Sequence, residues 1–175
     1  MRLDMINHEP SRLVLQEVAR LANWGRELPD GHAQGIAYVL SSEAATAQVI
    51  EVRNSGEAIE IVKVFAAVDV GIALDPRNIE AQVKSSIIFG LSAAITGKIT
   101  VSDGVVDQTN YHTYTPLRIY QAPEIELVIV ESGDEIYGVG ESGTPGAAPA
   151  LGNAIFAATG KRIRELPFRD HLQIS

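Results

Sequence analysis

Residues 59–97 read IEIVKVFAAVDVGIALDPRNIEAQVKSSIIFGLSAAITG, and this stretch decides the fold class. From residue 59 to residue 70, apolar residues at every second position give one uniformly apolar face and one mixed face, which predicts a strand with one well-buried side. Asp75 and Pro76 then predict a helix start, because an Asp N-cap accepts a backbone N–H and Pro at the first helical position loses no hydrogen bond. The predicted helix ends at Gly97, and its broad apolar face contains Ile79, Val83, Ile87, Leu91 and Ile95 with the small residues Ser86, Gly90 and Ala94. We expect this helix to be central and largely buried.

The flanking segments predict further elements. Upstream, residues 44–52 should pair with residues 59–70 across a turn at 54–56, and Ser11 should cap a helix that Gly25 ends. The polar segment 25–35 reads as a connection. Downstream, the pattern indicates a hairpin over 98–108, a strand over Glu124–Val130, and a helix over 147–159 that follows Thr144 and Pro145 and stops at Gly160.

These elements predict an α+β fold in which two main helices pack on an antiparallel or mixed sheet. A chain of 175 residues suits a single domain over residues 1–175. We expect residues 1–10 and 169–175 to be loose termini.

Composition excludes several function classes. The 14 Lys and Arg against 22 Asp and Glu give a net charge of −8, which opposes a nucleic-acid-binding surface. The absence of cysteine excludes disulfides, thiol nucleophiles and iron–sulfur clusters held by this chain, and it suits the cytoplasm. No apolar run approaches the ~20 residues that span a bilayer, and residues 1–10 lack a signal-peptide hydrophobic region. We therefore expect a cytoplasmic protein without a nucleic-acid partner or a membrane span.

Residues 138–143, GVGESG, are too rich in glycine for a helix or strand and must form a shaped loop before the last helix. They match G-x-G-x-x-G, but the loop does not come directly off a strand and too little chain follows it for a dinucleotide-binding unit. A serine-hydrolase elbow fails on glycine spacing. Glu141 would become a useful base if apolar neighbours such as Val139 and Ala147 closed over it. The alternative, favoured by composition alone, is a solvated acid near a helix start.

Several separated motifs occur together in this chain. They are 138–141 (GVGE), 143–145 (GTP), 148–160 (APALGNAIFAATG), and 68–71 (VDVG) followed by Pro76, Gln82 and 89–91 (FGL). From about Arg12 to Phe168 the chain resembles the C-terminal part of the molybdopterin-binding (large or beta) subunit of the xanthine dehydrogenase/aldehyde oxidase family. The nearest branch is the isoquinoline oxidoreductase beta subunit and related bacterial aldehyde dehydrogenases.

The resemblance implies part of a molybdenum hydroxylase that oxidises an aldehyde or N-heteroaromatic substrate with water as the oxygen source. It implies that Glu141 is the general base and that Gln82, Val139 and Gly140 contact the pterin, Gln82 through an amide that donates and accepts. The cofactor would be molybdopterin, plain or in a cytosine dinucleotide form, and its own sulfurs would bind molybdenum, so the chain would supply no metal ligand. The implied partners are the remainder of the subunit and a 2Fe-2S subunit.

Two departures and the chain length qualify the resemblance. Ser142 stands where the family often has Pro, and Gly146 replaces a more rigid residue, so we expect a looser loop. Family subunits are several times longer, so we expect the isolated chain to hold no cofactor and to be inactive. The alternative is a non-catalytic cofactor-binding or assembly module that lacks the rest of the active site.

Other polar and aromatic residues read as structural. The four histidines, His8, His32, His112 and His171, show no metal-ligand spacing and read as surface or ordinary polar residues. Tyr111 and Tyr114 are expected to pack, and Asp69 is expected to tie the strand end to the next loop.

Overall fold

The computed structural model describes residues 3–41, 43–133 and 135–175. The main elements are α1 (Glu9–Leu21), β1 (His32–Ser41), β2 (Ala44–Asn54), β3 (Ile59–Asp69), α2 (Pro76–Thr96), β6 (Glu124–Val130) and α3 (Thr144–Thr159). Shorter elements are η1 (Leu3–Met5), β4 (Val101–Ser102), β5 (Val105–Val106), η2 (Tyr111–Thr113) and η3 (Phe168–Asp170).

One four-stranded sheet organises the molecule, with strand order β1-β2-β3-β6. β1, β2 and β3 are successive antiparallel neighbours, whereas β6 runs parallel to β3 after a long crossover through α2. The parallel pair requires this crossover, because a hairpin joins only antiparallel strands. The sheet is therefore mixed, and the predicted α+β class is confirmed.

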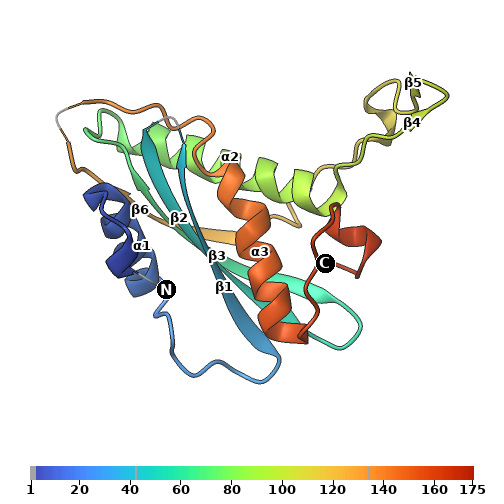
Figure 1. Ribbon diagram of the computed structural model, residues 1–175, viewed down its shortest axis with the longest axis horizontal. Helices are drawn as coiled ribbons and strands as arrows, with labels where there is room; N and C mark the ends of the chain where they lie inside the picture. The colour runs from blue at the N-terminus through green and yellow to red at the C-terminus, as the bar shows by residue number, and fades with distance from the viewer. Residues whose placement is uncertain (1–2, 42, 134) are drawn as a thin grey trace.

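Helices cover both faces of this sheet (Figure 1). The face toward α2 and α3 carries the larger apolar cluster, to which β3 contributes Val64, Ala66 and Val68. The face toward α1 carries a smaller cluster, to which β3 contributes Phe65 and Ala67. Alternate residues of β3 thus belong to two apolar clusters, one on each face of the sheet. The predicted N-terminal helix, α1, covers the face opposite the two main helices.

The long helix forms as its sequence predicts. Asp75 is the N-cap of α2, and its side chain accepts from the backbone N–H of Asn78 at 3.2 Å. Each residue of the predicted apolar face is buried, while the opposite face is exposed. α2 crosses α3 closely at Gly90, where an ideal Cβ would lie 2.6 Å from the carbonyl oxygen of Thr144. α2 thereby lies directly against the loop that begins α3.

The N-terminal third differs from the prediction in two places. α1 begins at Glu9 with Pro10 in its first turn, where a missing N–H costs no hydrogen bond, so Ser11 is inside the helix and does not cap it. Ser11 is buried instead, and its Oγ lies 2.5 Å from the hydroxyl of Tyr38. β1 was not predicted, and it begins inside the segment read as a connection. Gly35 fits this strand because an ideal Cβ there would lie 2.1 Å from the backbone nitrogen of Ala154 in α3.

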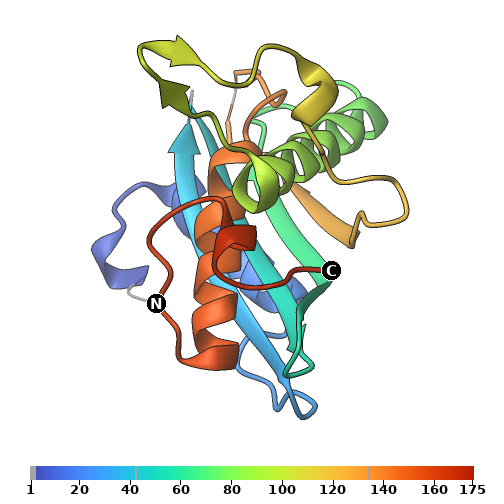
Figure 2. The ribbon, with the colours of Figure 1, turned by 90° about the vertical axis from the view of Figure 1, so that its right-hand side faces the viewer.

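The expectation of loose termini is wrong for the residues that the structure describes. Ser175 N donates to the carbonyl oxygen of Ile59 at 2.9 Å, and Ile59 N donates to that of Gln173 at 2.9 Å, so the last residues lie along the start of β3 (Figure 2). Leu172 and Ile174 also pack against the larger cluster, and Leu3 and Ile6 pack against the smaller one. Apolar packing therefore holds both ends, and backbone hydrogen bonds to β3 also hold the C-terminal end. Residues 1 and 2 lie outside the described part of the chain.

Candidate active site

The loop over residues 138–143 crosses α2 just before α3 begins. Gly143 N donates to Ser86 Oγ at 3.1 Å, and Thr144 Oγ1 donates to the carbonyl oxygen of Ser86 at 3.1 Å. Ser86 lies on the buried face of α2, and its hydroxyl donates to Val83 O at 2.8 Å. One serine of α2 therefore fixes both the end of the loop and the first residue of α3.

The sheet holds the same loop from the other side. Gln48 of β2 is fully buried, and its Nε2 donates to the carbonyl oxygen of Gly143 at 2.6 Å. An ideal Cβ on Gly146 would lie 2.7 Å from this Nε2, so Gly146 leaves room for the Gln48 side chain. Within the described part of the chain, Gln48 Oε1 and the nearby Thr46 Oγ1 are buried without a hydrogen-bond partner. Gln48 and Ser86 were not predicted, although Gln48 is a polar residue in an otherwise apolar segment.

The two residues that depart from the family pattern lie at defined places in the structure. Ser142 is buried, and its hydroxyl donates to Val139 O at 3.2 Å. The absence of a side chain at Gly146 leaves room for the Gln48 amide. A looser loop stays a prediction.

The predicted site residues lie together at one end of α2. Gly140 and Glu141 line a cavity of about 460 Å³ whose other walls are Ser41, Ser85, Ser86, Phe89, Thr144 and Pro145. Gln82 lies one turn before Ser86, and its Oε1 is 4.0 Å from the place that a Cβ on Gly140 would occupy. The Gln82 amide therefore lies beside Gly140, the residue before Glu141, and both Gln82 and Glu141 are exposed.

Two details of this region differ from the expectation. Val139 packs against the larger apolar cluster and does not line the cavity. Ala147 is fully buried within the first turn of α3, whereas Glu141 is exposed, so these neighbours do not close over Glu141. The turn that buries Ser142 leaves Glu141 on the outer side of the loop.

A larger cavity of about 1120 Å³ lies between α2 and β6, lined in part by Lys84, Ile88 and Leu127. It contains none of the predicted site residues. We place the candidate site at the smaller cavity, because Gly140, Glu141 and the start of α3 line it and Gln82 lies beside Gly140.

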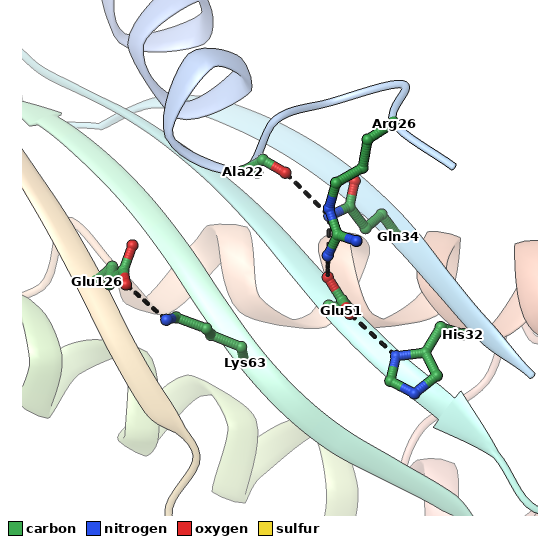
Figure 3. Close-up of polar contacts among 7 residues, drawn as sticks. All are labelled: Ala22, Arg26, His32, Gln34, Glu51, Lys63 and Glu126. Carbon is green, nitrogen blue, oxygen red and sulfur yellow. Dashed lines mark hydrogen bonds and ion pairs between the residues drawn. The ribbon is translucent and has the colours of Figure 1, made fainter. Parts of the chain in front are cut away.

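A buried ion-pair cluster on the α1 side of the sheet has a structural role (Figure 3). Glu51 is 5% exposed and accepts from Arg26 Nη2 at 2.6 Å, His32 Nδ1 at 3.0 Å and Gln34 Nε2 at 3.1 Å. Burial alone would raise the pKa of the Glu51 carboxyl, but the hydrogen bonds from His32 and Gln34 and the charge of Arg26 outweigh it and lower that pKa. The cluster ties the segment after α1 to the sheet, and His32 takes part in it as an ordinary polar residue, as one of the two readings predicted.

Asp69 ties the end of β3 to the next segment, as expected. It is fully buried, and its carboxylate accepts from Ser132 Oγ at 2.6 Å and from Gly71 N at 3.2 Å. Residues 3–41, 43–133 and 135–175 hold no group of three or more His, Cys, Asp or Glu side chains able to bind a metal. In the same residues no helix has the length and apolar character needed to cross a membrane.

Comparison with known proteins identifies the family. The model of the molybdopterin cofactor-binding domain matches residues 11–123, which include Gln82. The chain is 37% identical over 177 residues to the isoquinoline 1-oxidoreductase subunit beta of Brevundimonas diminuta, covering 98% of this chain and 23% of that protein. It is 34% identical over 164 residues to a protein of Gluconacetobacter polyoxogenes named membrane-bound aldehyde dehydrogenase [pyrroloquinoline-quinone], covering 89% and 21%. The chain thus spans less than a quarter of the length of either relative.

Solved structures share the fold. Quinoline 2-oxidoreductase from Pseudomonas putida 86 superposes with a TM-score of 0.61 at 22% identity, over 71% of this chain and 17% of that chain. The aldehyde oxidoreductase from Desulfovibrio desulfuricans superposes with a TM-score of 0.60 at 22% identity, over 71% and 14%. The chain therefore belongs to the molybdopterin cofactor-binding domain family, which forms part of the molybdenum-binding subunits of the xanthine dehydrogenase family.

Proposed function

We propose that this chain is part of a molybdenum hydroxylase that oxidises an aldehyde or N-heteroaromatic substrate with oxygen from water. In this proposal Glu141 is the general base, and Gln82 with the backbone of Val139 and Gly140 contacts the pterin. The observation that carries the proposal is that Gly140 and Glu141 line one cavity beside the start of α3, with Gln82 next to Gly140. The names of the relatives support the aldehyde and N-heterocycle classes.

The residues at this cavity suit a pterin cofactor. Gly140 presents bare backbone, since an ideal Cβ there would have only Gln82 Oε1 within 4.0 Å. The exposed Gln82 amide can donate and accept at the same time, as a pterin edge requires. When bound, the molybdenum-pterin cofactor, in its plain or cytosine dinucleotide form, supplies the redox chemistry. The chain contributes shape, hydrogen bonds and a carboxylate.

Glu141 can act as a base because its backbone is fixed while its side chain is free. The contacts of Gly143 with Ser86 and Gln48 hold the loop two residues away, and Thr144 N donates to Glu141 O at 2.9 Å. Glu141 lines the cavity, and in this proposal its carboxylate accepts a proton from a hydroxyl group held there. Enclosure by the remainder of the subunit would exclude water and strengthen the base.

The test is Glu141→Gln in the assembled enzyme, with Glu135→Gln as the matched control. Glu135 is an exposed acid on the preceding segment and does not line the cavity. We expect Glu141→Gln to retain molybdenum and lose about 10²–10⁴-fold in turnover, the usual contribution of a general base. Full activity with bound molybdenum in Glu141→Gln would overturn the role of Glu141, and so would an equal loss in the control.

A second candidate, a non-catalytic cofactor-binding or assembly module, is favoured by the exposure of Glu141. Molybdenum analysis of the native material separates the two. Stoichiometric molybdenum in a complex with the remainder of the subunit and a 2Fe-2S subunit supports the enzyme, and a complex that never contains molybdenum supports the module. We also propose a cytoplasmic location, supported by the cysteine-free composition.

A further inference from the structure

An arm formed by residues 98–120 leaves the body of the molecule between α2 and β6. It contains the β4–β5 hairpin and η2. The hairpin lies beyond the end of α2 and away from the four-stranded sheet (Figure 1). β4 and β5 pair with each other and form a separate two-stranded sheet.

The arm concentrates exposed apolar side chains. Eight of the 17 large hydrophobic residues that are exposed in the described part of the chain lie within these 23 residues: Ile99, Val101, Val105, Val106, Tyr111, Tyr114, Ile119 and Tyr120. Ile119 is 94% exposed and Tyr120 is 83% exposed. Tyr111 and Tyr114 contact each other edge to face, and Tyr111 is otherwise largely exposed. Such a concentration marks an interaction surface.

The exposed side chains sit on an ordered frame. In the hairpin, Thr100 N donates to Gln108 Oε1 at 2.8 Å, and Asp107 N donates to Thr100 O at 2.9 Å. The base is tethered to α2, because Leu117 N donates to Ser92 Oγ at 3.0 Å and Thr96 Oγ1 donates to Thr115 O at 2.8 Å. The arm is therefore pre-organised, which lowers the entropic cost of binding.

We infer that this arm docks into an apolar groove on the remainder of the molybdenum-binding subunit, an inference that rests on the proposed function for its partner. The chain covers 23% and 21% of two relatives, so in those proteins most of the subunit lies outside the matching region. Permanent interfaces are more hydrophobic than transient ones. Of the four charged residues in the arm, Lys98 is already paired with Asp170 at 2.6 Å. The apolar character of the arm thus fits a permanent contact inside one subunit.

The first experiment identifies the partner in the assembled enzyme. A photoreactive benzoylphenylalanine replaces Tyr120, the sample is irradiated, and the cross-linked peptides are sequenced. We expect cross-links to the remainder of the molybdenum-binding subunit, whether it lies on the same polypeptide or on a separate one. Cross-links confined to the iron–sulfur subunit or to a second copy of this chain would overturn the inference, as would a fully assembled enzyme in which the probe reacts with nothing.

The second experiment measures the contribution of the arm. The double substitution Ile119→Glu and Tyr120→Glu is compared with the control Met5→Glu. Met5 lies in η1, outside the arm, and is 70% exposed. We expect the double variant to lower the yield of assembled enzyme about tenfold or more, and the control to leave it unchanged. An unchanged yield in the double variant would contradict the inference. Because Glu141→Gln should assemble normally, failure of the arm and failure of the catalytic proposal give different results.

Discussion

Gly143 lies where the loop before α3 crosses α2, and its position depends on the absence of a side chain. An ideal Cβ at this residue would lie 2.5 Å from Ser86 Oγ, 2.7 Å from Ile87 Cγ1 and 3.0 Å from Val83 O. The backbone of Gly143 also contacts Ser86 and Gln48 through its N–H and its carbonyl oxygen. The side chains of Ser86 and Gln48 thus hold Gly143 in place, and with it the loop that carries Glu141 two residues earlier.

Gly143→Ala should destabilise the protein because the buried face of α2 leaves no room for a methyl group. We expect the free energy of unfolding to fall by about 1–3 kcal/mol, the usual cost of overpacking. The matched control is Gly138→Ala, since an ideal Cβ at Gly138 meets no atom within 4 Å. Denaturant unfolding of both variants checks this. Equal stability of the two variants would show that the loop does not press on α2.

At the scale of elements, the Glu51 cluster joins the 22–32 connection to β2. Arg26 lies in that connection, and His32 and Gln34 lie in β1. Gln34 also donates to Ala22 O at 3.2 Å, just after α1 (Figure 3). One buried carboxylate therefore connects α1, β1 and β2.

Glu51→Gln should lower the free energy of unfolding by about 1–3 kcal/mol at pH 7, because charge-assisted hydrogen bonds are lost. The pKa of the Glu51 carboxyl is lowered from 4.5, so its contribution is fully present above about pH 4.5 and disappears as the pH falls through the folded-state pKa. The difference in the free energy of unfolding between Glu51→Gln and wild type should therefore shrink as the pH falls below about 4.5.

Denaturant unfolding at a series of pH values from about 3 to about 7 tests this pH dependence, because that range extends from below to above the ordinary pKa of a Glu carboxyl. Glu60→Gln is the control, because Glu60 forms an exposed pair with Arg53 on the sheet surface, where ion pairs contribute little. A difference between Glu51→Gln and wild type that stays constant with pH would contradict the ionised state of Glu51.

Elements with strong local signals were predictable from the sequence, and contacts between distant segments were not. The cap at Asp75, the spacing of Ile79 to Ile95 and the stop at Gly160, which has a φ of 71°, each act within one element. β1 escaped prediction because Gly35 reads as a loop residue until α3 is placed against it. The parallel pairing of β6 likewise depends on the crossover through α2.

The candidate site divides in the same way. The resemblance of the motifs singled out Gln82, Val139, Gly140 and Glu141, and the structure brings Gln82, Gly140 and Glu141 together. The residues that hold them, Gln48 and Ser86, are separated from Gly143 by 95 and 57 positions. No local pattern predicts contacts over such separations, because they exist only once β2, α2 and α3 pack against each other.

At the scale of the whole molecule, two surfaces of the chain are exposed in a way that suits contact with further protein. The cavity beside Glu141 is open, and the arm over residues 98–120 carries apolar side chains into solvent. The relatives are more than four times as long as the matching region, which in them covers 23% and 21% of the protein. Both surfaces are accounted for if the rest of a molybdenum-binding subunit covers the arm and closes the cavity.

The central claim is that the loop held by Gln48 and Ser86 brings the Glu141 carboxylate to the molybdenum centre. An experimental structure of the assembled enzyme with its cofactor bound tests this most directly. We predict that Glu141 lies beside the bound cofactor, with the Gln82 amide within hydrogen-bond distance of the pterin. A structure in which the cofactor lies away from the cavity of Gly140 and Glu141 would contradict it.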